Sequence, residues 1–152
     1  MSKKKICLVT SSGGHLFKVY CLKQWWVSYE RFWVTRRDQF SLSILKGEKT
    51  YFAFFPENRN FINFVRNLFF AYSLLRKEKP DIVFSTGAGI APPFMIIAKL
   101  LNIKTIFLET FILIPKATIS GRLLYPIVDL FLVQNKNLLK TYPKAQYWGS
   151  VL

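Results

Sequence analysis

The chain has 152 residues, enough for one domain with one hydrophobic core and too few for a complete two-domain enzyme. With 51% hydrophobic and 17% aromatic residues it is too apolar to be disordered, and 22 Lys and Arg against 8 Asp and Glu give a formal net charge of +14. Because this charge accompanies a mean hydropathy of +0.21, the composition favours a membrane surface over nucleic acid. We expect residues 1–152 to form a single domain.

Nothing in the sequence predicts export or a membrane-spanning helix. The apolar stretch 6–10, which follows three lysines, is too short for a signal peptide. The longest uncharged run, 82–98, contains two glycines and two prolines and falls short of the about 20 apolar residues that a spanning helix needs. Cys7 and Cys21 have no metal-type spacing, which favours reduced thiols. We therefore expect a cytosolic protein that lies on a membrane without crossing it.

Short β-type runs alternate with helical stretches along the whole chain, the pattern of an α/β domain with a parallel sheet. Strands are expected at residues 6–10, 32–35, 50–54, 82–85, 105–108 and 130–133, with a further candidate at 146–148. Helices are expected at about 14–28, 39–46, 60–79, 90–101 and 135–141, with a short or irregular helical piece between 119 and 125. The predicted fold is a doubly wound, mainly parallel, Rossmann-like sheet whose first five strands have the order 3-2-1-4-5.

Two loops that contain glycine follow expected strands, and each one precedes a helix. The first glycine loop consists of Ser11, Ser12, Gly13 and Gly14, and the second glycine loop consists of Thr86, Gly87, Ala88 and Gly89. Glycine lets a backbone approach a ligand closely, and the free N–H groups of a helix N-terminus bind phosphate. In the expected strand order both loops flank the crevice where the order reverses, which predicts a ligand that bears a diphosphate. A tight turn without a ligand remains an alternative for the first loop.

Two side chains near these loops are candidates for catalysis. His15, the only histidine, lies at the start of a helix, whose dipole disfavours the imidazolium and keeps the ring able to accept a proton near pH 7. Glu109 follows the strand at 105–108 in an apolar stretch, so it needs a partner such as a loop N–H group or a substrate hydroxyl. Each has a structural alternative: His15 can merely order its loop, and Glu109 can serve the fold alone.

The expected helix at 60–79 is apolar over most of its circumference, whereas a helix on one face of a sheet needs only one apolar stripe. We expect part of this surface to contact lipid. The candidate membrane residues are Phe61, Phe64, Val65, Leu68, Phe69 and Tyr72. The alternative is that neighbouring elements cover the surplus.

Cofactors and metal ions are not expected. The chain has no Asp-x-Asp pair for a metal-held nucleotide diphosphate, no P-loop ending, and too few His, Cys and carboxylate residues for a metal cluster. The first glycine loop also lacks the glycine spacing of the dinucleotide-binding fingerprint, which argues against nicotinamide and flavin cofactors.

Three segments together carry a resemblance to a known family. They are Ser11-Ser-Gly-Gly-His-Leu, Ser85-Thr-Gly-Ala-Gly after Lys79-Pro-Asp-Ile-Val-Phe, and Ile106-Phe-Leu-Glu-Thr. In this order they resemble the Alg14 family, including its bacterial capsule and exopolysaccharide members of the PssD/Cps14F type, over essentially the whole chain. Members of this family resemble the N-terminal, acceptor-binding half of a GT-B glycosyltransferase such as MurG.

The resemblance implies a subunit of a two-component glycosyltransferase, inactive alone, on the anionic cytoplasmic face of the plasma membrane. It implies binding of a polyprenyl-diphosphate-linked saccharide, to which the complex adds a sugar from a UDP-sugar in capsule or exopolysaccharide synthesis. A separate, Alg13-like catalytic subunit then carries the sugar-nucleotide site. By the same resemblance, His15 meets the acceptor and takes the role of general base towards the sugar hydroxyl.

The last residues are the expected contact with that subunit, because the chain stops where a full GT-B enzyme continues into its second half. Tyr147 and Trp148 are of the types favoured at interfaces, and Val151 and Leu152 form an apolar end. The alternative is that Tyr147 and Trp148 complete the packing of the last strand.

Two other classes of function stay open. A peripheral membrane scaffold without active-site residues has the same basic and apolar surface. A nucleic-acid-binding domain explains the charge of +14, but it should bind DNA or RNA with steep salt dependence.

Overall fold

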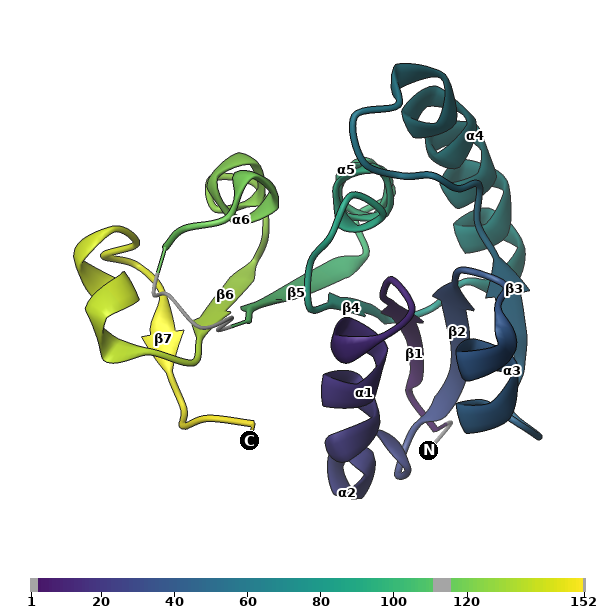
Figure 1. Cartoon of the computed structure of the whole chain (residues 1–152), viewed down its shortest axis with the longest axis horizontal. Helices are drawn as coiled ribbons and strands as arrows, with labels where there is room; N and C mark the ends of the chain where they lie inside the picture. The colour runs from purple at the N-terminus through teal and green to yellow at the C-terminus, as the bar shows by residue number, and fades with distance from the viewer. Residues whose placement is uncertain (1–2, 111–115, 152) are drawn as a thin grey trace.

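The computed structural model describes residues 3–110 and 116–151, which form a parallel sheet with helices on both faces (Figure 1). In this part of the chain the sheet has seven strands in the order β3-β2-β1-β4-β5-β6-β7, and every neighbouring pair is parallel. The strands are β1 (Lys5–Val9), β2 (Glu30–Thr35), β3 (Thr50–Phe52), β4 (Ile82–Ser85), β5 (Lys104–Glu109), β6 (Leu130–Val133) and β7 (Gln146–Tyr147). The predicted fold class and the order 3-2-1-4-5 are confirmed, and β6 and β7 extend the sheet beyond β5.

Each helical region expected from the sequence contains a helix in the structure, but not every boundary agrees. They are α1 (Gly14–Cys21), α2 (Lys23–Trp26), α3 (Gln39–Ile44), α4 (Phe61–Glu78), α5 (Ala91–Leu100), α6 (Ile119–Leu124) and the 3-10 helix η1 (Lys136–Lys140). The prediction of one helix over 14–28 is wrong, because the helix is interrupted at Leu22, which separates α1 from α2. The backbone oxygen of Val19 accepts bonds from Leu22 N at 3.0 Å and from the Trp26 indole at 2.8 Å, which replaces regular α-helical pairing at this point.

The local sequence explains where α4 and α5 begin. Asn60 caps α4 by accepting a bond from the backbone N–H of Asn63 at 2.9 Å. Pro92 and Pro93 lie in the first turn of α5, where backbone N–H groups have no partner within the helix, so proline costs no hydrogen bond there. Both helices therefore start close behind loops at the carboxyl edge of the sheet.

The two faces of the sheet carry separate apolar clusters, because successive strand side chains point to opposite sides. On one face α4, α5 and α6 pack over strand residues that include Cys7 and Val9. On the other face α1 and α2 contribute Leu16, Val19 and Trp26. This second layer is incomplete, since α1 and α2 lie under β1 and β4 and none of the described helices lies under β5 and β6 (Figure 1).

The uncovered part of this face forms an apolar groove of about 500 Å³, which we call the open groove. Its floor is made by side chains of β4, β5 and β6: Ile82, Phe84, Ile106, Leu108, Leu130 and Leu132. Trp25 of α2 and the segment 148–151 form its walls. Strands of parallel sheets are normally covered by helices on both faces. The open groove is a core-like surface that no described helix covers, although Phe84, Leu108 and Leu132 in its floor are buried.

Candidate functional site

The two glycine loops meet at the carboxyl edge of the sheet. Because β1 pairs with β4, with Val9 opposite Ser85, the loops that follow these strands lie side by side. Nδ1 of His15 lies 3.1 Å from the backbone oxygen of Thr86, and the hydroxyl oxygens of Thr10 and Thr86 are 3.4 Å apart. The structure therefore brings together two loops that are distant in sequence, at the place where the strand order reverses.

Glycine is needed in both loops for its backbone conformation. Gly13 has a φ of +89° and Gly87 a φ of +110°, a region that other residues rarely adopt. A Cβ atom on Gly13 or Gly14 would have no neighbouring atom within 4 Å. The first glycine loop therefore faces open space beside the N-terminus of α1, where backbone N–H groups can meet an anion.

A third segment, residues 55–58 between β3 and α4, rests against the second glycine loop. A Cβ atom on Gly89 would lie 2.6 Å from the backbone oxygen of Glu57 and 2.9 Å from Oδ1 of Asn58, so this close contact requires glycine. No motif marked this segment in the sequence. A signal was nevertheless present, because it follows β3, whose carboxyl end lies at the same edge of the sheet as those of β1 and β4.

A cavity of about 280 Å³ separates the first glycine loop from this third segment, and we call it the crevice pocket. It is lined by Ser11, Ser12, Gly13, Arg36, Asp38, Phe40, Phe55 and Glu57. Arg36 and Asp38 follow β2, so the ends of β1, β2 and β3 all contribute to the pocket. Arg36, Asp38 and Glu57 were not predicted as site residues, because charged residues in loops are usually solvated and carry no motif.

Asp38 connects the crevice pocket to the first glycine loop. Its Oδ1 accepts bonds from Ser12 Oγ at 2.9 Å and from the backbone N–H of Ser41 at 2.8 Å, and the latter bond caps α3. Its Oδ2 faces Nε of Arg36 at 3.9 Å. Desolvation acts to raise the pKa of Asp38, but the bonds from Ser41 and Ser12 and the charge of Arg36 outweigh it, and the pKa lies below its ordinary value. Asp38 is therefore an ionised acceptor that fixes the position of the loop.

His15 is held in one orientation by Thr86. A carbonyl oxygen only accepts hydrogen bonds, so Nδ1 carries the proton of the neutral ring and Nε2 presents its lone pair. Burial is the main cause that lowers the pKa of His15 below 6.5; the Thr86 carbonyl opposes it and Lys18 adds to it. The ring is therefore neutral at pH 7 and suited to accept a proton at Nε2. The main cause of its lowered pKa is burial, whereas the sequence pointed to the helix dipole.

Glu109 is buried, and its oxygens are occupied by the start of α6. Oε1 accepts from the backbone N–H of Thr118 at 2.7 Å and Oε2 accepts from the Thr118 hydroxyl at 3.0 Å. Thr118 in turn caps α6 by accepting from Gly121 N at 2.9 Å, and a Cβ atom on Gly121 would lie 2.2 Å from Oε2. Burial raises the pKa of Glu109, although the bonds from Thr118 oppose it. These contacts favour the structural role that the sequence left open.

The helix α4 has two asparagines among its mainly apolar inner residues, and it exposes several aromatic side chains on its outer face. Asn67 is buried and bonds both the N–H and the backbone oxygen of Phe54, at 2.9 and 3.0 Å, while Asn63 donates to Pro56 at 3.0 Å. These amides hold the segment between β3 and α4 in place, which explains why asparagine occupies two buried positions of α4.

The candidate membrane residues divide into two groups. Phe61 and Phe69 are 78% and 73% exposed, and Tyr72 is also exposed. Phe64, Val65 and Leu68 are half-buried, so both the exposed patch and the partial cover by neighbours are present. Within the described ranges no helix is both long and apolar enough to cross a bilayer.

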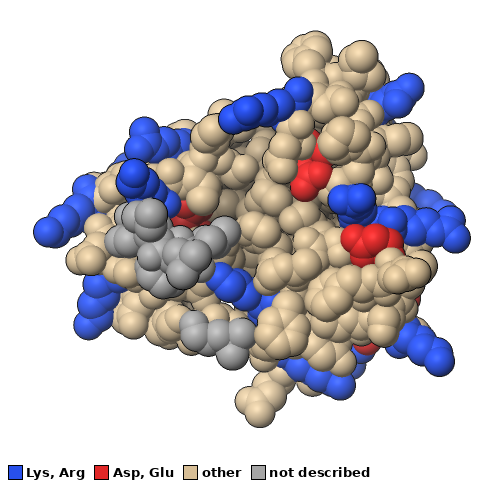
Figure 2. All heavy atoms as spheres, in the orientation of Figure 1, with Lys and Arg blue, Asp and Glu red and all other residues tan. Residues whose placement is uncertain are grey.

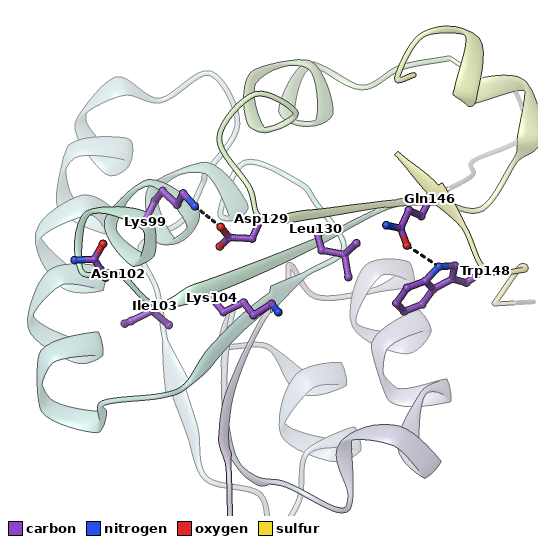
Figure 3. Close-up of a pocket in the computed structure, with 8 residues that line it drawn as sticks. All are labelled: Lys99, Asn102, Ile103, Lys104, Asp129, Leu130, Gln146 and Trp148. Carbon is purple, nitrogen blue, oxygen red and sulfur yellow. Dashed lines mark hydrogen bonds and ion pairs between the residues drawn. The ribbon is translucent and has the colours of Figure 1, made fainter. Parts of the chain in front are cut away.

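The C-terminal candidates also differ in their surroundings. Tyr147 and Trp148 are exposed, and the Trp148 indole donates to Oε1 of Gln146 at 2.9 Å (Figure 3). Val151 packs against the α1–α2 side of the sheet. Leu152 lies outside the described residues.

Trp148 stands between the open groove and a more polar cavity of about 650 Å³ at the amino edge of the sheet. Figure 3 shows this cavity with the ion pair of Lys99 and Asp129 on one side and Lys104 beneath it. Leu130 and Trp148 line both cavities, so this polar cavity adjoins the open groove.

Comparison with known proteins gives a consistent picture. The family described as "Oligosaccharide biosynthesis protein Alg14 like" matches residues 6–151. The UDP-N-acetylglucosamine transferase subunit ALG14 of Candida albicans is 34% identical over 91 residues, which cover 56% of this chain and 41% of that protein. The UDP-N-acetylglucosamine–N-acetylmuramyl-(pentapeptide) pyrophosphoryl-undecaprenol N-acetylglucosamine transferase of Borreliella burgdorferi is 25% identical, with 99% of this chain and 46% of that protein covered.

Solved structures share the fold. MurG of Acinetobacter baumannii superposes with a TM-score of 0.78 at 17% identity, over 97% of this chain and 45% of that one. UDP-N-acetylglucosamine 2-epimerase of Rickettsia bellii also gives 0.78, at 13% identity, over 99% and 46% of the two chains. This chain spans less than half the length of these relatives.

Proposed function

Since this chain belongs to the Alg14 family of oligosaccharide biosynthesis proteins, we propose that it is the acceptor-binding subunit of a two-component glycosyltransferase. The acceptor is a saccharide joined through a diphosphate to a polyprenyl lipid, and a donor-binding partner of the Alg13-like type supplies the UDP-sugar. The reaction belongs, in this proposal, to capsule or exopolysaccharide synthesis at the cytoplasmic face of the plasma membrane.

The observation that carries the proposal is the meeting of the two glycine loops beside a neutral histidine. The first glycine loop is open at Gly13 and Gly14, and the start of α1 adds N–H groups directed at the same space. Arg36 lies nearby with a largely exposed guanidinium. These donors suit a diphosphate.

In the proposed reaction His15 acts as the general base. The acceptor hydroxyl gives its proton to Nε2 as its oxygen forms a bond to the anomeric carbon of the donor sugar. The bond from that carbon to the diphosphate of the donor UDP-sugar breaks, and UDP leaves with the electron pair. The bond from Nδ1 to Thr86 orients the ring for this step.

The outward face of α4 supports peripheral attachment to an anionic membrane. Phe61 and Phe69 project into solvent, and Arg66, Arg76 and Lys77 of the same helix are exposed. Each basic side chain near an anionic surface contributes about 1 kcal/mol, and inserted aromatic side chains add apolar burial. Figure 2 shows Lys and Arg side chains all round one face of the molecule, with few carboxylates between them.

The open groove supports docking of the donor-binding subunit. Its floor has the composition of a protein core, and Trp148 at its border is 70% exposed. Aromatic and aliphatic residues around a concave surface are typical of interface anchors. The exposed Trp148, proposed from the sequence as a partner contact, thus borders the surface to which the partner would bind.

The test is sugar transfer by the chain with and without its donor-binding partner. A UDP-sugar and a short-chain prenyl-diphosphate saccharide serve as substrates, and UDP release is measured. The proposal predicts turnover by the complex and none by the chain alone. Turnover by the chain alone would contradict the two-component mechanism, and a complex of unchanged activity after replacement of His15 would favour the scaffold alternative.

A further inference from the structure

The crevice pocket is lined by two aromatic residues, which the glycine loops lack. Phe40, at the start of α3, is 42% exposed, and Phe55 is half-buried. Both aromatic residues line the cavity, together with Asp38 and Glu57, and the guanidinium of Arg36 lies 5.9 Å from the centre of the Phe55 ring. Aromatic surface combined with hydrogen-bond acceptors suits a ligand that has both C–H faces and hydroxyl groups.

The charge of the crevice pocket differs from that of the protein as a whole. The chain carries a net charge of +14, yet the pocket has the carboxylates of Asp38 and Glu57 against the single guanidinium of Arg36. One positive and two negative groups leave this pocket with a charge of −1. The side of the pocket that carries Asp38 and Glu57 therefore suits a neutral polyol better than an anion, which fits the glycine loop and Arg36 on the other side.

Acceptor groups remain available in the crevice pocket. Oδ1 of Asp38 is occupied by Ser12 and Ser41, but Oδ2 has only the distant Nε of Arg36, at 3.9 Å. The carboxylate of Glu57 forms no hydrogen bond or ion pair with the described residues. Ionised carboxylates only accept, and sugar hydroxyls donate to them.

We propose that the crevice pocket binds a neutral sugar ring of the acceptor, next to the diphosphate held by the glycine loops. This inference rests on the proposed function, because the diphosphate fixes where the sugar begins. Ser11, Ser12 and Gly13 belong to both the first glycine loop and the pocket wall, so a sugar joined directly to the diphosphate reaches the pocket. The volume of about 280 Å³ is at the lower end of small-ligand sites and has room for one monosaccharide. Phe40 and Phe55 contact the ring face, while Glu57 and Oδ2 of Asp38 accept from its hydroxyls.

The experiment measures the contribution of the sugar to binding by the full chain. The probes are farnesyl diphosphate and the same lipid diphosphate carrying one glucose, galactose or N-acetylglucosamine, with Kd from calorimetry. At least one glycosylated probe should bind roughly tenfold more tightly than the bare diphosphate. Phe40→Ala combined with Glu57→Gln should abolish this difference without raising the Kd of farnesyl diphosphate, because the variant removes a negative charge and no diphosphate donor. Asp38 is kept, because it also caps α3.

The control is Phe17→Ala, since Phe17 is 46% exposed on α1 and does not line the crevice pocket. This variant should retain the full preference for the glycosylated probe. Equal loss in Phe17→Ala, or a sugar preference that survives in the Phe40→Ala and Glu57→Gln variant, would overturn the subsite. Absence of a sugar preference in the wild-type chain would overturn it as well. Failure of farnesyl diphosphate to bind at all would instead contradict the proposed function.

Discussion

Nδ1 of His15 lies 3.1 Å from the backbone oxygen of Thr86, a residue 71 positions further along the chain. This one bond joins the two loops, selects the tautomer with a free Nε2, and depends on the pairing of β1 with β4. The only histidine of the chain is therefore positioned by the topology of the sheet, and its chemistry can be tested separately from its place in the fold.

If His15 is the general base that we propose, its replacement by Gln should lower the turnover of the reconstituted complex by roughly 10²- to 10⁴-fold. Thermal unfolding of the variant should stay close to wild type. Because burial is the main cause that lowers the pKa of His15, the wild-type rate should fall only when the pH drops below 6.5. A loss below tenfold would leave His15 as a residue that orders the loop.

Glu78 provides a test of the fold that is independent of the function. Its side chain is 4% exposed and bonds Lys5 at 2.8 Å, Lys49 at 2.7 Å and the hydroxyl of Tyr51. Burial acts to raise the pKa of Glu78, but the bonds from Lys49, Lys5 and Tyr51 outweigh it and lower the pKa from 4.5 to about 2. Since the folded-state pKa is depressed, this stabilisation is present above pH 4.5 and is lost as the pH falls towards 2.

Glu78→Gln should therefore lower the free energy of unfolding by about 3 kcal/mol at pH 7, and the difference from wild type should shrink at pH 3. Urea unfolding at both pH values measures it. Glu30→Gln is the control, because Glu30 pairs with the same Lys5 at 3.3 Å but its side chain is 61% exposed. The same loss for Glu78→Gln at both pH values would show that ionisation of Glu78 does not stabilise the fold.

The sequence was sufficient for the features that depend on local pattern. Runs such as 6–10 and 82–85 predicted the strands, and their order followed from the alternation of strand and helix. Features that depend on tertiary contact were not predictable in the same way. The break at Leu22 arises from the bond of the Trp26 indole to Val19, and the inward turn of Asn67 arises from its bonds to Phe54. Arg36, Asp38 and Glu57 acquire a common role only because β2 and β3 end beside β1.

Membrane attachment should depend on the exposed aromatic residues of α4. Phe61→Glu with Phe69→Glu should weaken binding to vesicles containing phosphatidylglycerol at least tenfold in a sedimentation assay, because charge replaces the inserted apolar surface. Leu100→Glu, on α5 and 72% exposed in the wild type, should bind like wild type. Unchanged vesicle binding by the folded α4 double variant would locate the attachment elsewhere.

The proposed donor-binding subunit should dock at the open groove. Ile106→Asp places a charge on the groove floor, where solvent can still hydrate it in the isolated chain, so the chain should fold but fail to co-purify with its partner. Trp148→Ala should weaken the complex by roughly 2 kcal/mol or more if Trp148 is an anchor. A stable and active complex with Ile106→Asp would exclude the open groove as the interface.

The most direct test of acceptor binding at the glycine loops is the Kd of the isolated chain for farnesyl diphosphate, compared between wild type and Gly14→Val. A Cβ atom on Gly14 meets no atom within 4 Å, so the added side chain should leave folding unchanged and occupy only the space of the ligand. We expect clear binding by the wild type and a loss of at least tenfold in Gly14→Val, with equal melting temperatures. Equal affinity of the two proteins, or no binding by the wild type, would contradict a diphosphate site at these loops.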